Sequence, residues 1–279
     1  MTQTIKLMMT GLALAALAGC GTAYANQNPS AWVNPPAAAA PPIEPTAKPE
    51  PKPTPKPKPK PTITKPSSKP VVRHGGPANS LMRTGTAGVA LTFDDGPDPV
   101  QTPALLDLLA DQHVKATFCL VGRQARAYPA LVHRIAAEGH TLCNHSWSHS
   151  LTLGRTSPAA IRADLTRTNE AIHAAAPDAP VAYLRAPGGN FTPALVKAGR
   201  DLGMTSIYWD LDPRDWDHPA GESDRAHIDR LIRTVQKHTR RGSIILSHDR
   251  GQPDTIAAYR TLLPWLRARY ELTARPDEG

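Results

Sequence analysis

The chain has 279 residues, 30 of them proline, and a formal net charge of +8 at neutral pH. Most of this charge comes from seven lysines between Lys48 and Lys69, and residues 73–279 together carry only +2. A folded part that is nearly neutral lacks the basic surface of a nucleic-acid-binding domain, so we expect no DNA or RNA partner.

The N-terminus has the features of an export signal. Lys6 precedes an apolar run, Leu7 to Leu17, that is too short to span a bilayer but suits the core of a signal peptide. The run ends in Leu17-Ala18-Gly19-Cys20, which resembles the lipobox of bacterial lipoproteins and implies a signal peptide over residues 1–19 and a lipid on Cys20. Cleavage after Ala23-Tyr24-Ala25 is the alternative and would give a secreted protein. In both cases we expect an extracytoplasmic protein, anchored in the first case to a bacterial membrane and facing the wall or periplasm.

Residues 20–78 have the composition of a linker. The stretch from Lys52 to Pro61 alternates lysine or threonine with proline, and large apolar side chains are almost absent around it. Such a segment cannot bury enough apolar surface to fold, so we expect a disordered, extended Pro/Lys-rich linker. Its lysines either attract anionic wall polymers and lipid head groups or only keep the linker solvated and extended.

Residues 79–279 are predicted to form one folded domain with a core over about 86–272. Apolar runs predict strands at 88–93, 115–121, 140–144, 181–184, 204–209 and 243–246, and amphipathic patterns predict helices that begin at Thr102-Pro103 and span 128–138 and 158–176. Strands that alternate with helices favour a parallel sheet. Since about 190 residues are fewer than the roughly 250 of a full eightfold barrel, we expect an α/β fold with a distorted or incomplete (β/α) barrel.

Chemically capable side chains follow the predicted strands. They are Asp94-Asp95, His145, Arg185, the segment from Asp210 to Asp215, and His248. The C-terminal ends of parallel strands are where barrels of this kind build their active sites, so we expect these groups to share one site.

His145 and His149 lie four residues apart, which on one helical turn would aim both imidazoles at the same point. Two imidazoles and a carboxylate form a three-ligand set for zinc or a similar divalent ion. Such a pair is weak evidence alone in a chain with 11 histidines. The adjacent carboxylates of Asp94 and Asp95 strengthen it, because one can bind metal while the other accepts a proton; the alternative is a solvated Asp-Gly turn.

Five segments, in order, resemble the motifs of the NodB-homology polysaccharide deacetylases, carbohydrate esterase family four. They are Thr92 to Pro97, the His145 and His149 pair, Arg185 to Gly189, Asp212 to Trp216, and Leu246 to His248. Together they extend over most of the predicted domain.

The resemblance implies a metal-dependent hydrolase. Asp95, His145 and His149 would hold one divalent ion, with zinc favoured and cobalt, nickel or manganese as alternatives. Asp94 would be the general base acting on the metal-bound water. His248 would be the general acid that protonates the departing amine.

The resemblance also implies supporting roles. Arg185 would pair with Asp94, and Asp215 would orient His248. The backbone N–H of Gly188 would bind the oxyanion, and Pro187, Trp216 and Leu246 would line the substrate groove. Many relatives carry an aromatic residue where Gly188 stands, which leaves the substrate preference open.

The expected reaction is removal of N-acetyl groups from a cell-surface or wall polysaccharide, such as peptidoglycan or a chitin-like polymer of N-acetylglucosamine. The alternatives are an acetyl-ester deacetylase acting on xylan-like glycans and an inactive glycan-binding relative. The expected partners are the polysaccharide and, through the lipid anchor, the membrane, with the protein acting as a monomer.

Two cysteines remain if Cys20 carries lipid. In an oxidising compartment Cys119 and Cys143 are the expected partners of a single disulfide, since they lie in neighbouring predicted strands. The alternative is a pair of buried free thiols.

Overall fold

The computed structural model describes residues 75–276. The signal peptide, Cys20 and nearly all of the predicted linker lie outside these residues. Within the described range no helix is both long and apolar enough to cross a membrane.

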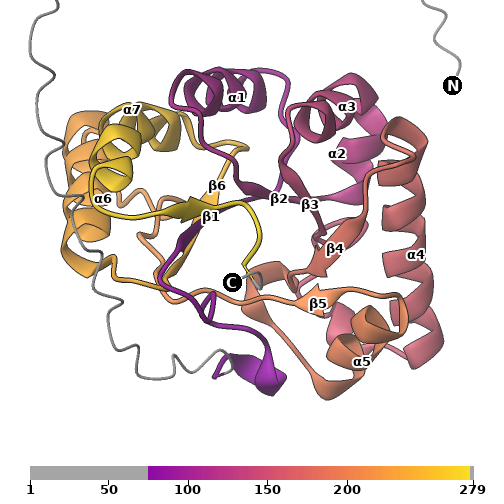
Figure 1. The fold of residues 1–279 in the computed structure, drawn as a ribbon. Coiled ribbons are helices and arrows are strands. Elements are labelled where there is room, and N and C mark those ends of the chain that lie inside the picture. The colour runs from indigo at the N-terminus through magenta and orange to yellow at the C-terminus, as the bar shows by residue number, and fades with distance from the viewer. Residues whose placement is uncertain (1–74, 277–279) are drawn as a thin grey trace, which may run out of the picture. The chain divides into compact units, whose positions relative to one another are not determined.

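A curved parallel sheet forms the centre of the domain (Figure 1). Six strands follow the order β5-β4-β3-β2-β1-β6, and a short seventh strand, β7, pairs with the first half of β1. Seven strands in the described residues, against eight in a complete barrel, match the expected incomplete (β/α) barrel. The strands are β1 (Val89–Asp94), β2 (Thr117–Leu120), β3 (Thr141–Asn144), β4 (Val181–Leu184), β5 (Thr205–Ser206), β6 (Ile244–His248) and β7 (Leu272–Thr273).

The α-helices lie around the outside of this sheet (Figure 1). They are α1 (Gln101–Asp111), α2 (Gly122–Ala127), α3 (Pro129–Ala137), α4 (Pro158–Ala175), α5 (Pro193–Asp201), α6 (Asp224–His238) and α7 (Pro253–Arg267). Three short 3-10 helices, η1 (Pro77–Asn79), η2 (Leu153–Arg155) and η3 (Pro187–Gly189), lie in the connections.

Side chains alternate between two cores along β1 and β2. Ala90 of β1 belongs to a small cluster inside the curve of the sheet, whereas Leu91 and Phe93 belong to the large cluster shared with the helices. Phe93 packs against Tyr259 of α7, with ring centroids 5.0 Å apart. Because β1 is buried on both faces, it has the nearly continuous apolar sequence typical of a central parallel strand.

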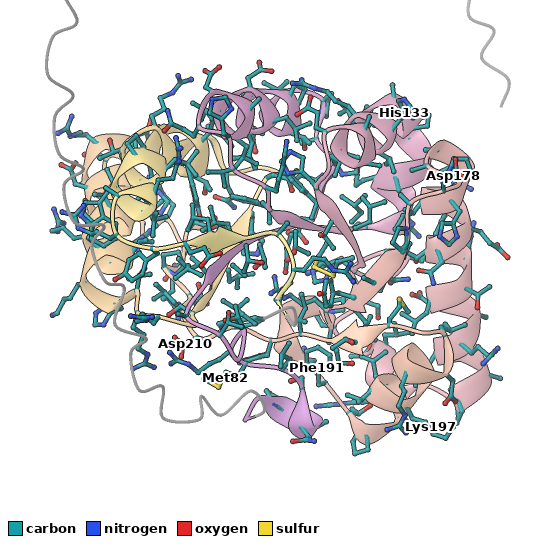
Figure 2. The ribbon with its side chains drawn as sticks, in the orientation of Figure 1. Met82, His133, Asp178, Phe191, Lys197 and Asp210 are labelled. Atoms are coloured by element: carbon teal, nitrogen blue, oxygen red, sulfur yellow. A yellow bond between two sulfur atoms is a disulfide. The ribbon has the colours of Figure 1, made fainter. Side chains whose placement is uncertain are left out.

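The disulfide joins β2 and β3 inside the curve of the sheet. Cys119 and Cys143 are directly opposed in the parallel ladder, with Cα atoms 4.1 Å apart, and their sulfur atoms are bonded (Figure 2). Cys119 is also in register with Asp94, the last residue of β1. The covalent bond therefore lies beside the strand end that carries the adjacent carboxylates.

Some local predictions were wrong. Thr102 does not cap α1, which begins at Gln101; instead the carboxylate of Asp98 accepts hydrogen bonds from the backbone N–H groups of Val100 and Gln101, at 2.8 and 2.9 Å. The hydroxyl of Thr102 donates to Asp249. The expected strand over 204–209 is only two residues long, because the chain leaves the sheet after Ser206.

Residues before the expected core also pack into the domain. Leu81 is buried and forms a parallel bridge with Ile207, and Arg83 forms an antiparallel bridge with Ser243. The segment that follows the linker is thus tied to residues next to β5 and β6.

Candidate active site

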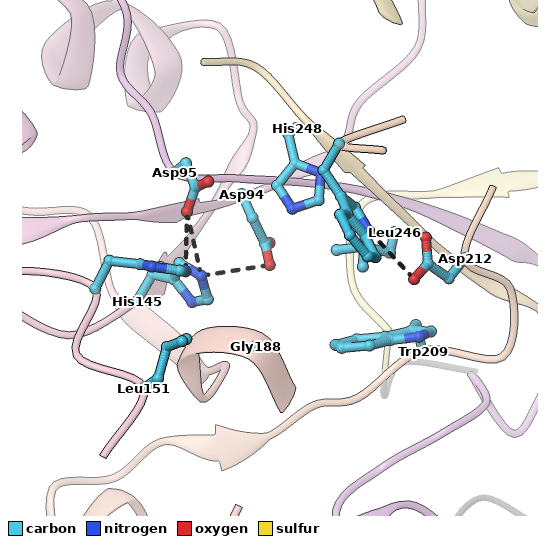
Figure 3. A pocket seen from close by; sticks show the side chains of 11 residues that line it. Asp94, Asp95, His145, Leu151, Gly188, Trp209, Asp212, Leu246 and His248 are labelled. Carbon is cyan, nitrogen blue, oxygen red and sulfur yellow. Dashed lines mark hydrogen bonds and ion pairs between the residues drawn. The ribbon is translucent and has the colours of Figure 1, made fainter. Parts of the chain in front are cut away.

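The C-terminal ends of the strands open into a cavity of about 390 Å³ (Figure 3). The five residues expected to bind metal or act as acid and base line it together: Asp94, Asp95, His145, His149 and His248. The other lining residues are Leu151, Gly188, Trp209, Asp212, Trp216 and Leu246. The structure therefore brings the predicted chemical groups to one place.

Two imidazoles converge on one carboxylate oxygen. Oδ1 of Asp95 lies 3.5 Å from Nε2 of His145 and 3.4 Å from Nε2 of His149. That oxygen is buried and accepts no hydrogen bond within the described residues. A buried carboxylate oxygen facing two imidazole nitrogens fits a divalent ion with nitrogen and oxygen ligands.

The two histidines reach this point through a turn, so the prediction of a helical turn was wrong. Ser146 and His149 have positive φ angles of 63° and 58°. The side chain of Asn144 accepts a hydrogen bond from the N–H of Ser146 at 2.9 Å, and Oγ of Ser146 accepts one from the N–H of His149 at 3.1 Å. These side-chain bonds hold the backbone in the left-handed conformation that the convergence requires.

A hydrogen bond orients the His145 ring. Its Nδ1 donates to the backbone carbonyl of Arg185 at 2.8 Å. With the proton on Nδ1, the lone pair of Nε2 faces Asp95. This is the arrangement in which a protein prepares a histidine to bind metal.

Asp94 and Arg185 form a buried ion pair. Nη1 of Arg185 donates to Oδ1 of Asp94 at 2.8 Å, and the guanidinium also donates to Oγ1 of Thr92 and to the carbonyl of Tyr208. Burial raises the pKa of Asp94, but the charge of Arg185, supported by the neighbouring imidazoles of His145 and His248 and by the hydrogen bond from Arg185, outweighs it and holds the pKa below its usual value. Asp94 is therefore an ionised base at neutral pH.

His248 is held by Asp215, which lies behind it and does not line the cavity. Nδ1 of His248 donates to Oδ1 of Asp215 at 2.8 Å, and Thr255 donates to Oδ2 of the same carboxylate at 2.7 Å. Burial lowers the pKa of His248, but the hydrogen bond and the charge of Asp215 dominate and raise it to about 9. The ring is thus a protonated acid at neutral pH.

The expected groove residues are only partly in place. Trp216 and Leu246 line the cavity, and 47% of Trp216 is exposed. Gly188 also lines it, with a φ of 59° that favours glycine. Pro187, the first residue of η3, is buried and is not among the residues that line the cavity, so its place in the groove stays a prediction.

Two lining residues, Trp209 and Leu151, were not singled out from the sequence, and Asp212 was part of a motif without an assigned role. Trp209 and Asp212 lie in the segment that follows β5. Trp209 ends the strand predicted over 204–209 and Asp212 comes three residues later, and this position at a strand end was a usable signal. Burial raises the pKa of Asp212, which accepts a hydrogen bond from Nε1 of Trp216 at 3.4 Å. Leu151 is a single apolar residue in a loop and carries no such signal. It faces Gly188, where an added Cβ would lie 3.0 Å from its Cδ2.

Comparisons with known proteins agree with this site. Residues 82–207 match the model of the polysaccharide deacetylase family. A chitooligosaccharide deacetylase of Sinorhizobium fredii is 37% identical over 198 residues, which cover 67% of this chain and 88% of the relative. A peptidoglycan-N-acetylglucosamine deacetylase of Bacillus cereus is 34% identical over 183 residues, covering 64% and 81%.

A solved structure has the same fold. It is a family 4 carbohydrate esterase pseudoenzyme from Bacillus anthracis, with a TM-score of 0.62 and 28% identity over 69% of this chain and 66% of that chain. The two curated relatives are deacetylases, hydrolases that act on carbon–nitrogen bonds, which confirms the expected enzyme class. The chain therefore belongs to the polysaccharide deacetylase family.

Proposed function

We propose that the protein removes N-acetyl groups from a cell-surface or wall polysaccharide by metal-assisted hydrolysis. One observation carries the proposal: an ionised carboxylate, Asp94, and a protonated imidazole, His248, line the same cavity as a cluster suited to metal. Amide hydrolysis needs a base for water and an acid for the leaving nitrogen, and these two residues hold the required opposite protonation states.

Asp94 is the base in this mechanism. Its Oδ1 is occupied by Arg185, while Oδ2 lies 3.6 Å from Nε2 of His145. A divalent ion held by Asp95, His145 and His149, with zinc the best match and cobalt, nickel or manganese as alternatives, would polarise the acetyl carbonyl and acidify a water. Asp94 takes the proton from the water that attacks the carbonyl carbon.

His248 is the acid. Because Nδ1 is bound to Asp215, Nε2 is the nitrogen left to protonate the amide nitrogen as the carbon–nitrogen bond breaks. The products are acetate and a free amine on the sugar. In this mechanism the backbone N–H of Gly188 stabilises the negative oxygen that forms during attack.

The lining of the cavity supports a sugar substrate. Trp216 and Trp209 offer aromatic surface, and Leu151 adds apolar surface on another side. Aromatic faces pack well against the apolar faces of sugar rings. The names of the two curated relatives refer to chitooligosaccharides and to peptidoglycan N-acetylglucosamine, which favours an N-acetylglucosamine polymer over an acetylated xylan.

Acetate release tests the proposal. The purified protein, loaded with zinc, is incubated with peptidoglycan, chitin oligosaccharides and acetylxylan. We expect acetate from one of the first two, and a loss of about a hundred- to ten-thousandfold in Asp94→Asn and in His248→Ala, both with metal content unchanged. His133→Ala, which changes an exposed histidine on α3, is the matched control.

Two outcomes would contradict this function. Acetate from acetylxylan alone would identify an ester deacetylase. No acetate from any substrate would indicate an inactive glycan-binding relative, like the B. anthracis pseudoenzyme in its lack of activity.

The metal ligands have a separate test. Equal metal content in the wild type, His145→Ala and His149→Ala would remove these residues from the metal site.

We also propose that the mature protein is anchored outside the cytoplasm by a lipid on Cys20. The support is the Leu17-to-Cys20 sequence after the apolar run. At about 3.1 Å per residue, an extended linker would let the domain reach more than about 100 Å from the membrane. Cys20→Ala is expected to move the protein from the membrane fraction to the soluble extracytoplasmic fraction, and unchanged fractionation would refute lipidation.

A further inference from the structure

A second group of metal-binding side chains lies outside the cavity, on α6, α7 and the loop before α6. It consists of His227 on α6, Asp254 in the first turn of α7, and His218 in the loop. One ligand atom from each lies within 4.8 Å of the others. None of the three belongs to the five sequence motifs that define the first site.

The contacts meet at one carboxylate oxygen. Nδ1 of His227 lies 2.8 Å from Oδ2 of Asp254, and Nε2 of His218 lies 3.7 Å from the same oxygen. Metal–ligand bonds of about 2.1 Å in a tetrahedral zinc site place ligand atoms about 3.4 Å apart. The 2.8 Å contact is a hydrogen bond from Nδ1 of His227, so a bound ion would replace its proton and lengthen this separation, whereas the 3.7 Å separation would shorten slightly.

Two of the three side chains are held in place by packing, and the third is open to solvent. His227 is 1% exposed and Asp254 is mostly covered, so packing between α6 and α7 determines their positions. The side chain of His218 is 36% exposed, which leaves a path for an ion from solvent. The rings of His218 and His227 are nearly perpendicular, with centroids 4.5 Å apart.

The local charge favours a cation. Oδ1 of Asp224, the first residue of α6, lies 3.6 Å from Nε2 of His218, so this exposed carboxylate can supply a fourth ligand. The nearby arginines are paired elsewhere: Arg225 with Asp229 at 3.0 Å, and Arg230 with Glu222 at 3.0 Å. Two carboxylates and two imidazoles are the ligand types that zinc prefers.

We propose that His218, His227 and Asp254, with Asp224 as an optional fourth ligand, bind a second divalent transition-metal ion, zinc above others. The ion would have a structural role, since it joins the loop, α6 and α7. It would also support the first site, because Asp254 precedes Thr255, whose hydroxyl donates to Asp215 at 2.7 Å. The proposal does not depend on the proposed function.

Metal counting in a variant that lacks the first site is the test. The full chain, without an affinity tag, carries His145→Ala and His149→Ala and is dialysed with zinc and then against metal-free buffer. We expect this double variant to keep about one zinc ion per chain. Adding His218→Ala is expected to reduce the zinc to near zero, whereas adding His133→Ala is expected to leave it unchanged.

Two further measurements separate binding from misfolding. Cobalt added to the double variant should give the intense visible absorption of a four-coordinate site, and His218→Ala should remove it. Zinc should raise the melting temperature of the double variant but not that of the variant that also carries His218→Ala, because an ion bound only by the folded state stabilises it. His218 lies in an exposed loop, so its removal is expected to leave the fold intact, which circular dichroism checks.

The result that overturns the proposal is a folded double variant with no zinc, no cobalt absorption and no melting shift. Zinc that persists after His218→Ala would equally place the ion elsewhere. Loss of deacetylase activity in the double variant bears only on the first site, so the two proposals fail independently.

Discussion

His248 and Asp215 are joined by two hydrogen bonds: ring Nδ1 donates to Oδ1 at 2.8 Å, and the backbone N–H donates to Oδ2 at 2.8 Å. One carboxylate thus fixes both the ring and the strand end that carries it. The same carboxylate raises the pKa of His248, which reaches about 9 against the opposing effect of burial.

Replacing this carboxylate with an amide is expected to shift the alkaline limb of the pH–rate profile. His248 acts only when protonated, so the wild type should lose activity as the pH rises through about 9. Asp215→Asn removes the negative charge and lowers the pKa of His248, so activity should fall at a lower pH than in the wild type. Above the new pKa, the rate should fall about tenfold for each pH unit. Profiles of kcat/KM measure it, with the exposed Asp107→Asn as control. An unmoved alkaline limb would remove Asp215 from this role.

Arg185→Met is expected to lower the free energy of unfolding and to shift the acid limb of the pH–rate profile to higher pH. Asp94 would remain buried without its partner, at a cost of about 3–5 kcal/mol in the free energy of unfolding. The pKa of Asp94 would rise, so the base would be lost at a higher pH than in the wild type. Urea unfolding and pH–rate profiles measure the two effects. Adding Asp94→Asn should recover part of the stability, and a double variant no more stable than Arg185→Met would argue against the ion pair as the cause.

The disulfide is expected to stabilise the domain by closing a short loop. Cys119 and Cys143 are 24 residues apart, for which the chain-entropy model gives about 3.5 kcal/mol. Replacing both with alanine should lower the free energy of unfolding by about that amount, measured with urea. A reducing agent should weaken the wild type and leave the double variant unaffected. Two reactive thiols per unfolded, unreduced chain would show that the bond does not form.

Because of Asp249, the free energy of unfolding is expected to fall as the pH rises toward about 7. It is fully buried, and burial, supported by the charges of Asp95 and Asp94, raises its pKa to about 7 despite the hydrogen bond from Thr102. Between about pH 4 and 7 the folded state therefore binds more protons than the unfolded state. The contribution of Asp249 to the free energy of unfolding is complete below the pKa of about 3.9 in the unfolded state. It is lost as the pH rises through about 7.

Asp249→Asn removes this titration while keeping the shape of the side chain. Urea unfolding at pH 5 and pH 8 should give a smaller decrease for the variant than for the wild type. Equal decreases would show that Asp249 does not titrate in this range.

The sequence by itself predicted the fold class and the chemical groups of the cavity, the carboxylates and imidazoles at the strand ends. Strands β1, β4 and β6 were visible as apolar runs, because a strand buried on both faces has few polar positions. Asp94 and His248 were found because each ends such a run. The C-terminal ends of parallel strands lie at one edge of the sheet, so residues that directly follow strands come together there. This part of the site could therefore be predicted from the order of residues along the chain.

Only the tertiary structure decided the features that depend on contacts between distant segments. The backbone conformation of His149, the burial of Pro187 and the place of Leu151 follow from how loops pack, and local patterns carry no information about that packing. His218 and Asp254 are 36 residues apart and meet only because a loop folds against the first turn of α7. Periodicity reports which face of an element is buried, whereas the identity of the neighbour on that face is determined by the three-dimensional arrangement of the whole domain.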